Sequence, residues 1–124
     1  MVQKRVKSEA DHLANASNHI QSVFQRYRKG ILEFGNDVLV NPTDVSYIGF
    51  MVSARRNRRI AAFTIGKQSF KVWLHVEPGT LHDPNHLTQK TKAGHTITIR
   101  DDKNFDYIVG LLQQSYVRNK TLAS

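Results

Sequence analysis

Apolar residues in the first third of the chain recur at steps of three and four, which is typical of one face of an amphipathic helix. The stripe consists of Leu13, Ala16, Ile20, Val23, Phe24, Tyr27, Ile31 and Phe34. This spacing predicts a helix over residues 9–34. Ser8, followed three residues later by Asp11, resembles a capping box at its start. Gly35 and Asn36 predict its end, because both tolerate the left-handed conformation found after a helix.

Beyond residue 40 the period changes from about 3.6 to two, and the pattern predicts strands instead of helices. We expect strands over residues 45–53, 59–65, 70–76 and 96–100. The connections at 55–58 and 66–68 are short enough to make the first three strands consecutive hairpins. A last apolar stripe predicts a second helix, capped by Asp101 or Asp102; it consists of Phe105, Ile108, Val109, Leu112 and Tyr116.

This helix-strand-strand-strand-strand-helix order predicts an α+β fold. We expect an antiparallel sheet of about four strands with both helices packed on one face. Residues 9–118 would form a single domain, between a flexible lead-in at 1–8 and a C-terminal tail at 119–124. By alternation, the open face of the sheet would show Lys71, Trp73 and His75, with Thr96, Thr98 and Arg100 nearby.

Charge adds a functional expectation to this fold. The 124 residues carry a net charge of +8, from 18 Lys and Arg against 10 Asp and Glu. Much of the excess lies within residues 55–71, which contain no acid and hold Arg55, Arg56, Arg58, Arg59, Lys67 and Lys71. Cations at this density attract polyanions, and Arg matches phosphate geometry. They predict phosphate contacts from a basic hairpin, and Trp73 adds a surface on which bases could stack.

Purely structural roles for these residues stay open as well. The arginines would also suit a turn that charge merely keeps soluble. Trp73 could instead lie under the 77–95 loop, as part of a second small cluster.

Several histidines are candidate catalytic or metal-binding groups. His82 and His86 stand four apart, with Asp83 between them and His95 further on, a spacing that could hold zinc on a helix. Pro84 and Gly79 predict a loop there, so we expect solvated histidines.

Carboxylates of the kind that hold a metal in nucleases lie in two groups. Glu77 and Asp83 lie near a strand end, and Asp101, Asp102 and Asp106 cluster where the last helix starts. Helix capping and the helix dipole account for the second group. We expect no catalytic residue, metal or cofactor.

Composition excludes several classes. The chain has no cysteine, which excludes disulfides, thiolate metal sites and cysteine nucleophiles and is typical of a cytoplasmic protein. It has no apolar run near 18 residues, so we expect no transmembrane helix. Its basic start leads into no apolar segment, so we expect no secretory signal.

Several segments together resemble a known family. They are Tyr47-Ile48-Gly49-Phe50, Ala62-Phe63-Thr64-Ile65, Phe70-Lys71-Val72-Trp73-Leu74, the Pro-Gly-x-Leu-x-Asp-Pro stretch at 78–84, and Phe105-Asp106-Tyr107-Ile108. The family is an uncharacterised bacterial domain labelled "predicted transport protein". It occurs alone or at the C-terminus of larger proteins, including some that resemble modification-dependent restriction endonucleases. The resemblance spans residues 9–118.

One departure from the family pattern is visible. Its Gly-His-Trp-Gly-like stretch before the last strand is reduced here to Gly94-His95, followed by Thr96. The resemblance implies an accessory module of a DNA-processing or defence system and brings no catalytic residues. The transport label gains no support from a chain without a predicted membrane segment.

These observations lead to one functional hypothesis and two alternatives. We expect a non-catalytic nucleic-acid-binding module, for DNA rather than RNA, with phosphate contacts from the basic hairpin. The first alternative is a protein-interaction module whose basic surface docks an acidic partner within a larger assembly. The second is an enzyme with a site in the 77–95 loop.

Overall fold

The computed structural model describes residues 7–42, 46–52 and 58–123. Within these residues three helices are present: α1 (Glu9–Leu13), α2 (Asn18–Leu32) and α3 (Phe105–Ala123). Six strands accompany them: β1 (Val38–Asn41), β2 (Ile48–Val52), β3 (Arg58–Ile65), β4 (Phe70–Leu74), β5 (Gln89–Thr91) and β6 (Gly94–Ile99). The strands form one antiparallel sheet in the order β1-β2-β3-β4-β6-β5.

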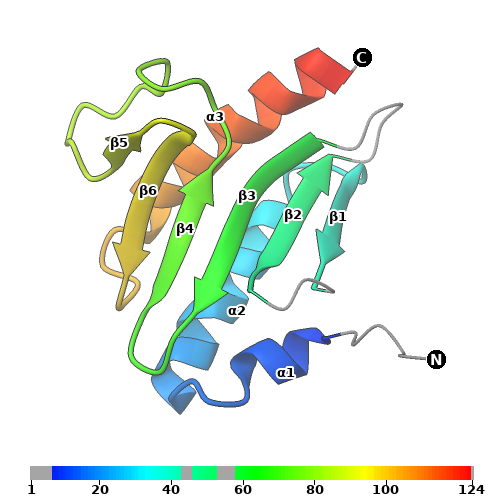
Figure 1. Cartoon of the computed structure of the whole chain (residues 1–124), viewed down its shortest axis with the longest axis vertical. Coiled ribbons are helices and arrows are strands. Elements are labelled where there is room, and N and C mark those ends of the chain that lie inside the picture. Colours follow the sequence, from blue (N-terminus) through cyan, green and yellow to red (C-terminus); the bar gives the residue numbers. More distant parts are fainter. Residues whose placement is uncertain (1–6, 43–45, 53–57, 124) are drawn as a thin grey trace.

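Two layers make up the described part of the molecule, as Figure 1 shows: α2 and α3 lie behind the sheet, and none of the described helices covers its front. The expected α+β class, with antiparallel strands and two helices on one face, is confirmed. The expected number of about four strands is wrong, because β1 and β5 extend the sheet at its two edges. Both added strands are short, and an edge strand such as β5 (Gln-Lys-Thr) needs no apolar face.

The core lies between the sheet and the two long helices. Its centre is Phe24 of α2, whose ring contacts Phe50, Phe63 and Phe70 with centroids 5.6–6.4 Å apart. The expected apolar stripe of the first helix is buried, apart from the half-buried Phe34. The alternation expected in residues 70–76 is present as well, since Phe70, Val72 and Leu74 point into this core. Periodicity therefore identified the buried faces correctly.

The helix expected over residues 9–34 is interrupted between α1 and α2. Ser17 caps α2 by accepting a hydrogen bond from the Ile20 amide, and its own amide donates to the carbonyl of Lys67 at 2.9 Å. The second contact ties the break to the turn between β3 and β4. The capping box of Ser8 and Asp11 is present at the start of α1.

The last helix is longer than expected and starts differently. α3 continues past residue 118 to Ala123, and Asn119 is only 2% exposed, so the tail expected from 119 begins as buried helix. The side chains of Asp101 and Asp102, expected to cap α3, contact other groups than its first turn. Asp101 accepts from the amide of Lys103, and Asp102 pairs with Arg26 of α2.

A β-bulge lies near the start of β3. Phe50 pairs with Ala61 but Met51 pairs with Arg59, so Ile60 is the extra residue. The Ile60 carbonyl accepts from the Ser115 hydroxyl of α3 at 2.6 Å and from the His75 amide at 3.2 Å. Bulges re-aim the side chains beside them, and this one shapes the site described below. No helix within the described residues is long and apolar enough to cross a membrane.

Candidate nucleic-acid interface

The uncovered face of the sheet has Trp73 near its middle. Trp73 pairs with Ala62 of β3 and Thr96 of β6, and its side chain is 37% exposed. The Lys71 ammonium lies 4.5 Å from the centre of its ring, a cation–π contact. The alternative that the 77–95 loop buries Trp73 is therefore wrong. The tryptophan and its cation belong to an open surface.

A second cation–aromatic pair lies across the same face. The Arg59 guanidinium sits 4.5 Å from the ring centre of Tyr47 and donates to its hydroxyl at 2.5 Å. The Nε of Arg59 is buried and has no hydrogen-bond partner among the described residues. A buried donor without an acceptor is costly, and the contacts of the guanidinium with Tyr47 offset this cost.

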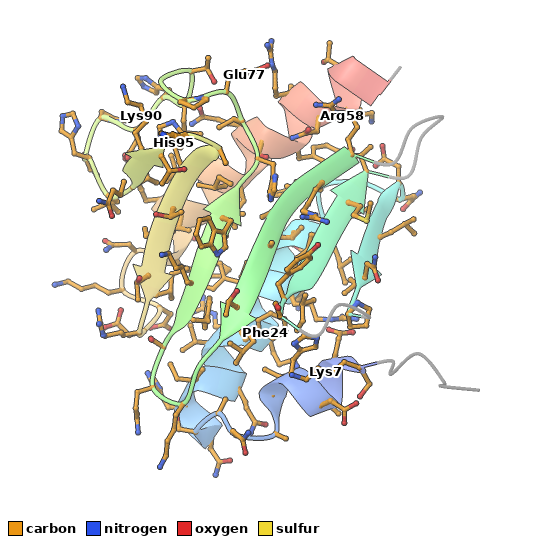
Figure 2. All side chains as sticks on the ribbon, viewed as in Figure 1. Lys7, Phe24, Arg58, Glu77, Lys90 and His95 are labelled. Carbon is orange, nitrogen blue, oxygen red and sulfur yellow. The ribbon has the colours of Figure 1, made fainter. Side chains whose placement is uncertain are left out.

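The open sheet face carries positive charge without neutralising acids. By register and alternation its described members are Leu39, Asn41, Tyr47, Gly49, Met51, Arg59, Ala62, Thr64, Lys71, Trp73, His75, Gln89, Thr91, Thr96 and Thr98. Two of these are cations and none is a carboxylate. Figure 2 shows the side chains that project from this face toward the viewer. The face is thus a mixed apolar and basic surface.

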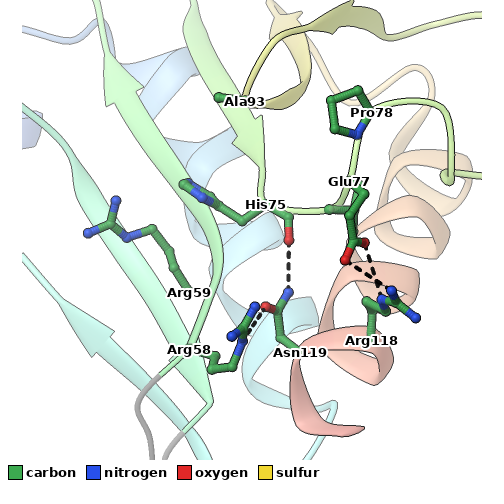
Figure 3. Close-up of a pocket in the computed structure, with 9 residues that line it drawn as sticks. Arg58, Arg59, His75, Glu77, Pro78, Ala93, Arg118 and Asn119 are labelled. Atoms are coloured by element: carbon green, nitrogen blue, oxygen red, sulfur yellow. Dashed lines mark hydrogen bonds and ion pairs between the residues drawn. The ribbon is translucent and has the colours of Figure 1, made fainter. Parts of the chain in front are cut away.

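A pocket of about 440 Å³ opens where β3 begins and β4 ends, against the C-terminal part of α3. Its lining residues are Arg58, Arg59, His75, Val76, Glu77, Pro78, Ala93, Arg118 and Asn119. Figure 3 shows that they come from the start of β3, the segment after β4, the turn before β6 and the helix, with the Arg59 side chain directed away from Arg58 and Arg118. We call this the arginine pocket.

Asn119 holds the walls of the arginine pocket together. Its amide nitrogen donates to the backbone carbonyls of His75 at 3.0 Å and Ser115 at 2.8 Å, and its amide oxygen accepts from Arg58 Nε at 3.2 Å (Figure 3). One buried amide thereby joins β3, the end of β4 and α3. Breaking such a fully used buried network leaves several polar groups without partners.

The charged groups of the pocket are unevenly balanced. Arg118 donates twice to Glu77, at 2.9 and 3.2 Å, and these hydrogen bonds lower the pKa of the Glu77 carboxyl. Burial, followed by the nearby Arg59 charge, lowers the pKa of His75, so its imidazole is neutral at pH 7. The pocket thus holds two guanidinium groups, of Arg58 and Arg118, against one carboxylate and one neutral ring, because the guanidinium of Arg59 lies over Tyr47.

The structure brings together some of the predicted binding residues and separates others. Arg59, Lys71 and Trp73 share the open face. Arg58 lies on the helix side, bonded to Asn119, because the bulge at Ile60 puts Arg59 on the open face and neighbouring strand residues point to opposite sides. Lys67 belongs to the turn between β3 and β4, at the opposite end of β3.

Arg55 and Arg56 lie outside the described residues. The expectation of one basic ribbon is therefore wrong for the described members, since the neighbours Arg58 and Arg59 point to different sides.

The segment expected as the 77–95 loop, which includes β5 and the first residues of β6, is organised around Asp83. Its carboxylate accepts hydrogen bonds from the Tyr107 hydroxyl, from the amides of Leu87 and Thr88 at 3.1 and 2.9 Å, and from the Thr88 hydroxyl at 2.8 Å. Burial opposes ionisation of Asp83, but these hydrogen bonds outweigh it and lower its pKa to about 2. Asp83 is thus an anionic anchor for the loop.

His95 extends this network. Its Nε2 accepts from the Gly79 amide at 3.2 Å, so the proton lies on Nδ1, which donates to the Thr88 hydroxyl at 3.1 Å. His95 is 7% exposed, so the expectation of a solvated loop histidine is wrong for it, whereas His82 and His86 are exposed. Among the described residues no group of three or more His, Cys, Asp or Glu side chains is placed to hold a metal.

The arginine pocket contains residues that sequence reasoning did not select for a site. Arg118 and Asn119 lie at the edge of the expected domain, and the sequence suggests Glu77 only as a metal ligand. The sequence held one signal for them: Ser115 and Asn119 follow Leu111 at four and eight residues, so all three lie on the same face of a helix. Polar residues in an apolar stripe predict buried partners.

Comparison with known proteins gave one relative. Over 118 residues the chain is 31% identical to an uncharacterized protein of Haemophilus influenzae, and the match covers 90% of this chain and 37% of that protein. The chain thus spans a little over a third of the relative's length. No family model matches the chain, and no solved structure matches it.

Proposed function

We propose that the open sheet face binds single-stranded nucleic acid without catalysis, and DNA rather than RNA. One observation carries the proposal: an exposed tryptophan beside a lysine, near the middle of a sheet face that has no carboxylate among its described residues. Stacking platforms of this kind combine an aromatic ring with nearby cations. A base would stack on the exposed part of the Trp73 ring, and its phosphate would lie within reach of Lys71.

Arg59 supplies the second phosphate contact on this face. Because its ring partner Tyr47 holds the guanidinium in one position, little side-chain freedom is lost on binding. Arg58 and Lys67, at the two ends of β3, keep their predicted role as further phosphate contacts. Arg55 and Arg56, which lie outside the described residues, keep that role as a prediction. Backbone contacts of this kind carry affinity but no sequence information.

A second candidate function is a protein-interaction module. The match to one part of a longer relative favours a segment that works within a larger polypeptide. A DNA-processing or defence assembly is the setting that the resemblance in sequence implies for it. Its surface would be the same face, where Leu39 is also exposed. A cytoplasmic location accords with either function and stays a prediction.

Trp73 makes the proposal directly testable, because it is the only tryptophan in the chain. We expect a single-stranded oligonucleotide to quench its fluorescence at low salt. In anisotropy titrations, Trp73→Ala should weaken binding about tenfold, since stacking contributes about 1–3 kcal/mol per base. Val117→Ala removes a comparably exposed apolar side chain from α3, which lies on the other side of the sheet, and should leave the affinity unchanged.

Salt dependence separates this function from protein docking. Each phosphate contact to a single strand adds about −0.7 to the slope of log affinity against log salt. The double variant Arg59→Gln and Lys71→Gln should therefore reduce the magnitude of the slope by about 1.4. An affinity for the strand that ignores salt, or that survives Trp73→Ala unchanged, would exclude the proposed mode of binding.

A further inference from the structure

We propose that Thr64, Lys71 and Thr98 together bind one backbone phosphate of the nucleic-acid strand, next to the base that stacks on Trp73. This inference rests on the proposed function and deepens it, because it assigns separate positions to the base and the phosphate of one nucleotide. The ligand is an internal phosphodiester, with one negative charge per phosphate. We call the three residues the threonine row.

Pairing register places the three side chains of the threonine row next to one another on the open sheet face. Lys71 of β4 lies directly opposite Thr64 of β3 on one side and Thr98 of β6 on the other. All three residues are exposed. Neighbouring strands lie about 4.8 Å apart, so a phosphate above the middle strand is within reach of a hydroxyl from either side. The row therefore presents one cation between two hydroxyl groups.

The donors of the threonine row are not used within the described part of the chain. There the Lys71 ammonium forms no ion pair, and neither threonine hydroxyl forms a hydrogen bond. Other threonine hydroxyls donate to acceptors of the chain itself, namely those of Thr80, Thr88, Thr91 and Thr121. Ammonium and hydroxyl donors without a protein partner can both donate to phosphate oxygens.

The next row of the sheet has a different character, which explains the separate position of the base. Trp73 lies two residues beyond Lys71 on the same face, about 6.7 Å along the strand. Its partners on the two neighbouring strands, Ala62 and Thr96, are each only 4% exposed. The indole ring therefore belongs to a filled surface on which a base can stack, whereas the hydrated threonine row suits the charged phosphate.

Lys71 connects the two positions. Its ammonium lies 4.5 Å from the centre of the Trp73 ring, so its charge stands at the boundary between the stacking surface and the threonine row. The two carboxylates that follow β6 have other partners, since Asp101 accepts from the Lys103 amide and Asp102 pairs with Arg26. Within the described part of this face, a phosphate would therefore displace no competing acid.

The test removes the two hydroxyls and leaves the charge in place. A double variant of the full chain, Thr64→Val with Thr98→Val, keeps β-branched side chains of similar size that suit a strand. In anisotropy titrations with a single-stranded thymidine oligonucleotide, we expect its affinity to fall about fivefold. The slope of log affinity against log salt should not change, because a neutral hydroxyl releases no counterion, whereas Lys71→Gln should reduce its magnitude by about 0.7.

Two matched variants separate loss of the hydroxyls from damage to the sheet. Thr64→Ser with Thr98→Ser keeps both hydroxyls and should bind within about twofold of the unaltered chain. Thr121→Val removes an exposed hydroxyl from α3, in the other layer of the molecule, and should leave the affinity unchanged. Circular dichroism checks that each variant is folded, and the two single valine variants replace the double variant if it is not.

The outcomes distinguish this inference from the function on which it rests. Equal affinities of the folded valine variant and the unaltered chain would overturn the threonine row as a phosphate site and leave the proposed function standing. A loss of affinity that the serine variant shares would also overturn it, because the hydroxyls would then not be the cause. Absence of binding by the unaltered chain would overturn both.

Discussion

Gly94→Ala is expected to lower the free energy of unfolding by about 3 kcal/mol, from backbone strain and overpacking together. Gly94 has φ of +145°, a conformation that L-residues rarely adopt. An added Cβ would also collide with the carbonyl oxygen of Leu74 and lie 3.1 Å from that of Val76. Both obstacles are backbone atoms of the segment that leaves β4, so they cannot move aside independently.

Urea denaturation followed by far-UV circular dichroism measures this loss. The control is Gly110→Ala in α3, where no atom would lie within 4 Å of the added Cβ. That change should raise stability by about 0.5–1 kcal/mol, because alanine favours helix over glycine. If Gly94→Ala were as stable as the unaltered chain, the approach of β6 to the end of β4 would have to be looser than described. The walls of the arginine pocket depend on this approach, since Ala93 lines it.

Asp83→Asn is expected to cost about 2 kcal/mol at pH 7, because hydrogen bonds to a charged acceptor are stronger than those to an amide. Four donors converge on the Asp83 carboxylate: the hydroxyls of Tyr107 and Thr88 and the amides of Leu87 and Thr88. An asparagine side chain offers only one acceptor oxygen, and its NH₂ group would face some of the N–H and O–H donors that contact Asp83. The loop from Glu77 to β6 should therefore loosen, which amide hydrogen exchange would detect at Leu87 and Thr88.

The pH dependence identifies the charge as the cause. The pKa of Asp83 is lowered to about 2 in the folded chain, so the unfolded chain binds the proton more readily. The stabilisation is therefore present above about pH 4 and is lost as pH falls toward 2.

The gap in unfolding free energy between the unaltered chain and Asp83→Asn should shrink over that range. Glu33→Gln, which neutralises an exposed carboxylate at the C-cap of α2, should show no such closing gap. A gap that is constant from pH 7 to pH 2 would mean that the carboxylate's charge contributes nothing.

Local pattern was enough to identify the buried faces of the principal elements. The stripe around Phe24 and the alternation through Phe70, Val72 and Leu74 arise from periods of 3.6 and two, which depend only on the chain's own geometry. The same alternation placed Lys71 and Trp73 together on the opposite side. The edge strands β1 and β5 carry no such pattern, and the break before α2 depends on a contact between Ser17 and the distant turn at Lys67.

The candidate site likewise has one part that local sequence pattern predicts and one part that it does not. Alternation within β4 determined that Lys71, Trp73 and His75 share a face, since neighbouring side chains of a strand point to opposite sides. Only the tertiary structure decided that the bulge at Ile60 turns Arg59 to the open face and Arg58 to the helix side, and that α3 brings Asn119 back to Arg58. Pairing register and helix docking join residues some sixty positions apart, and the energies that select them come from contacts that no local window of sequence contains.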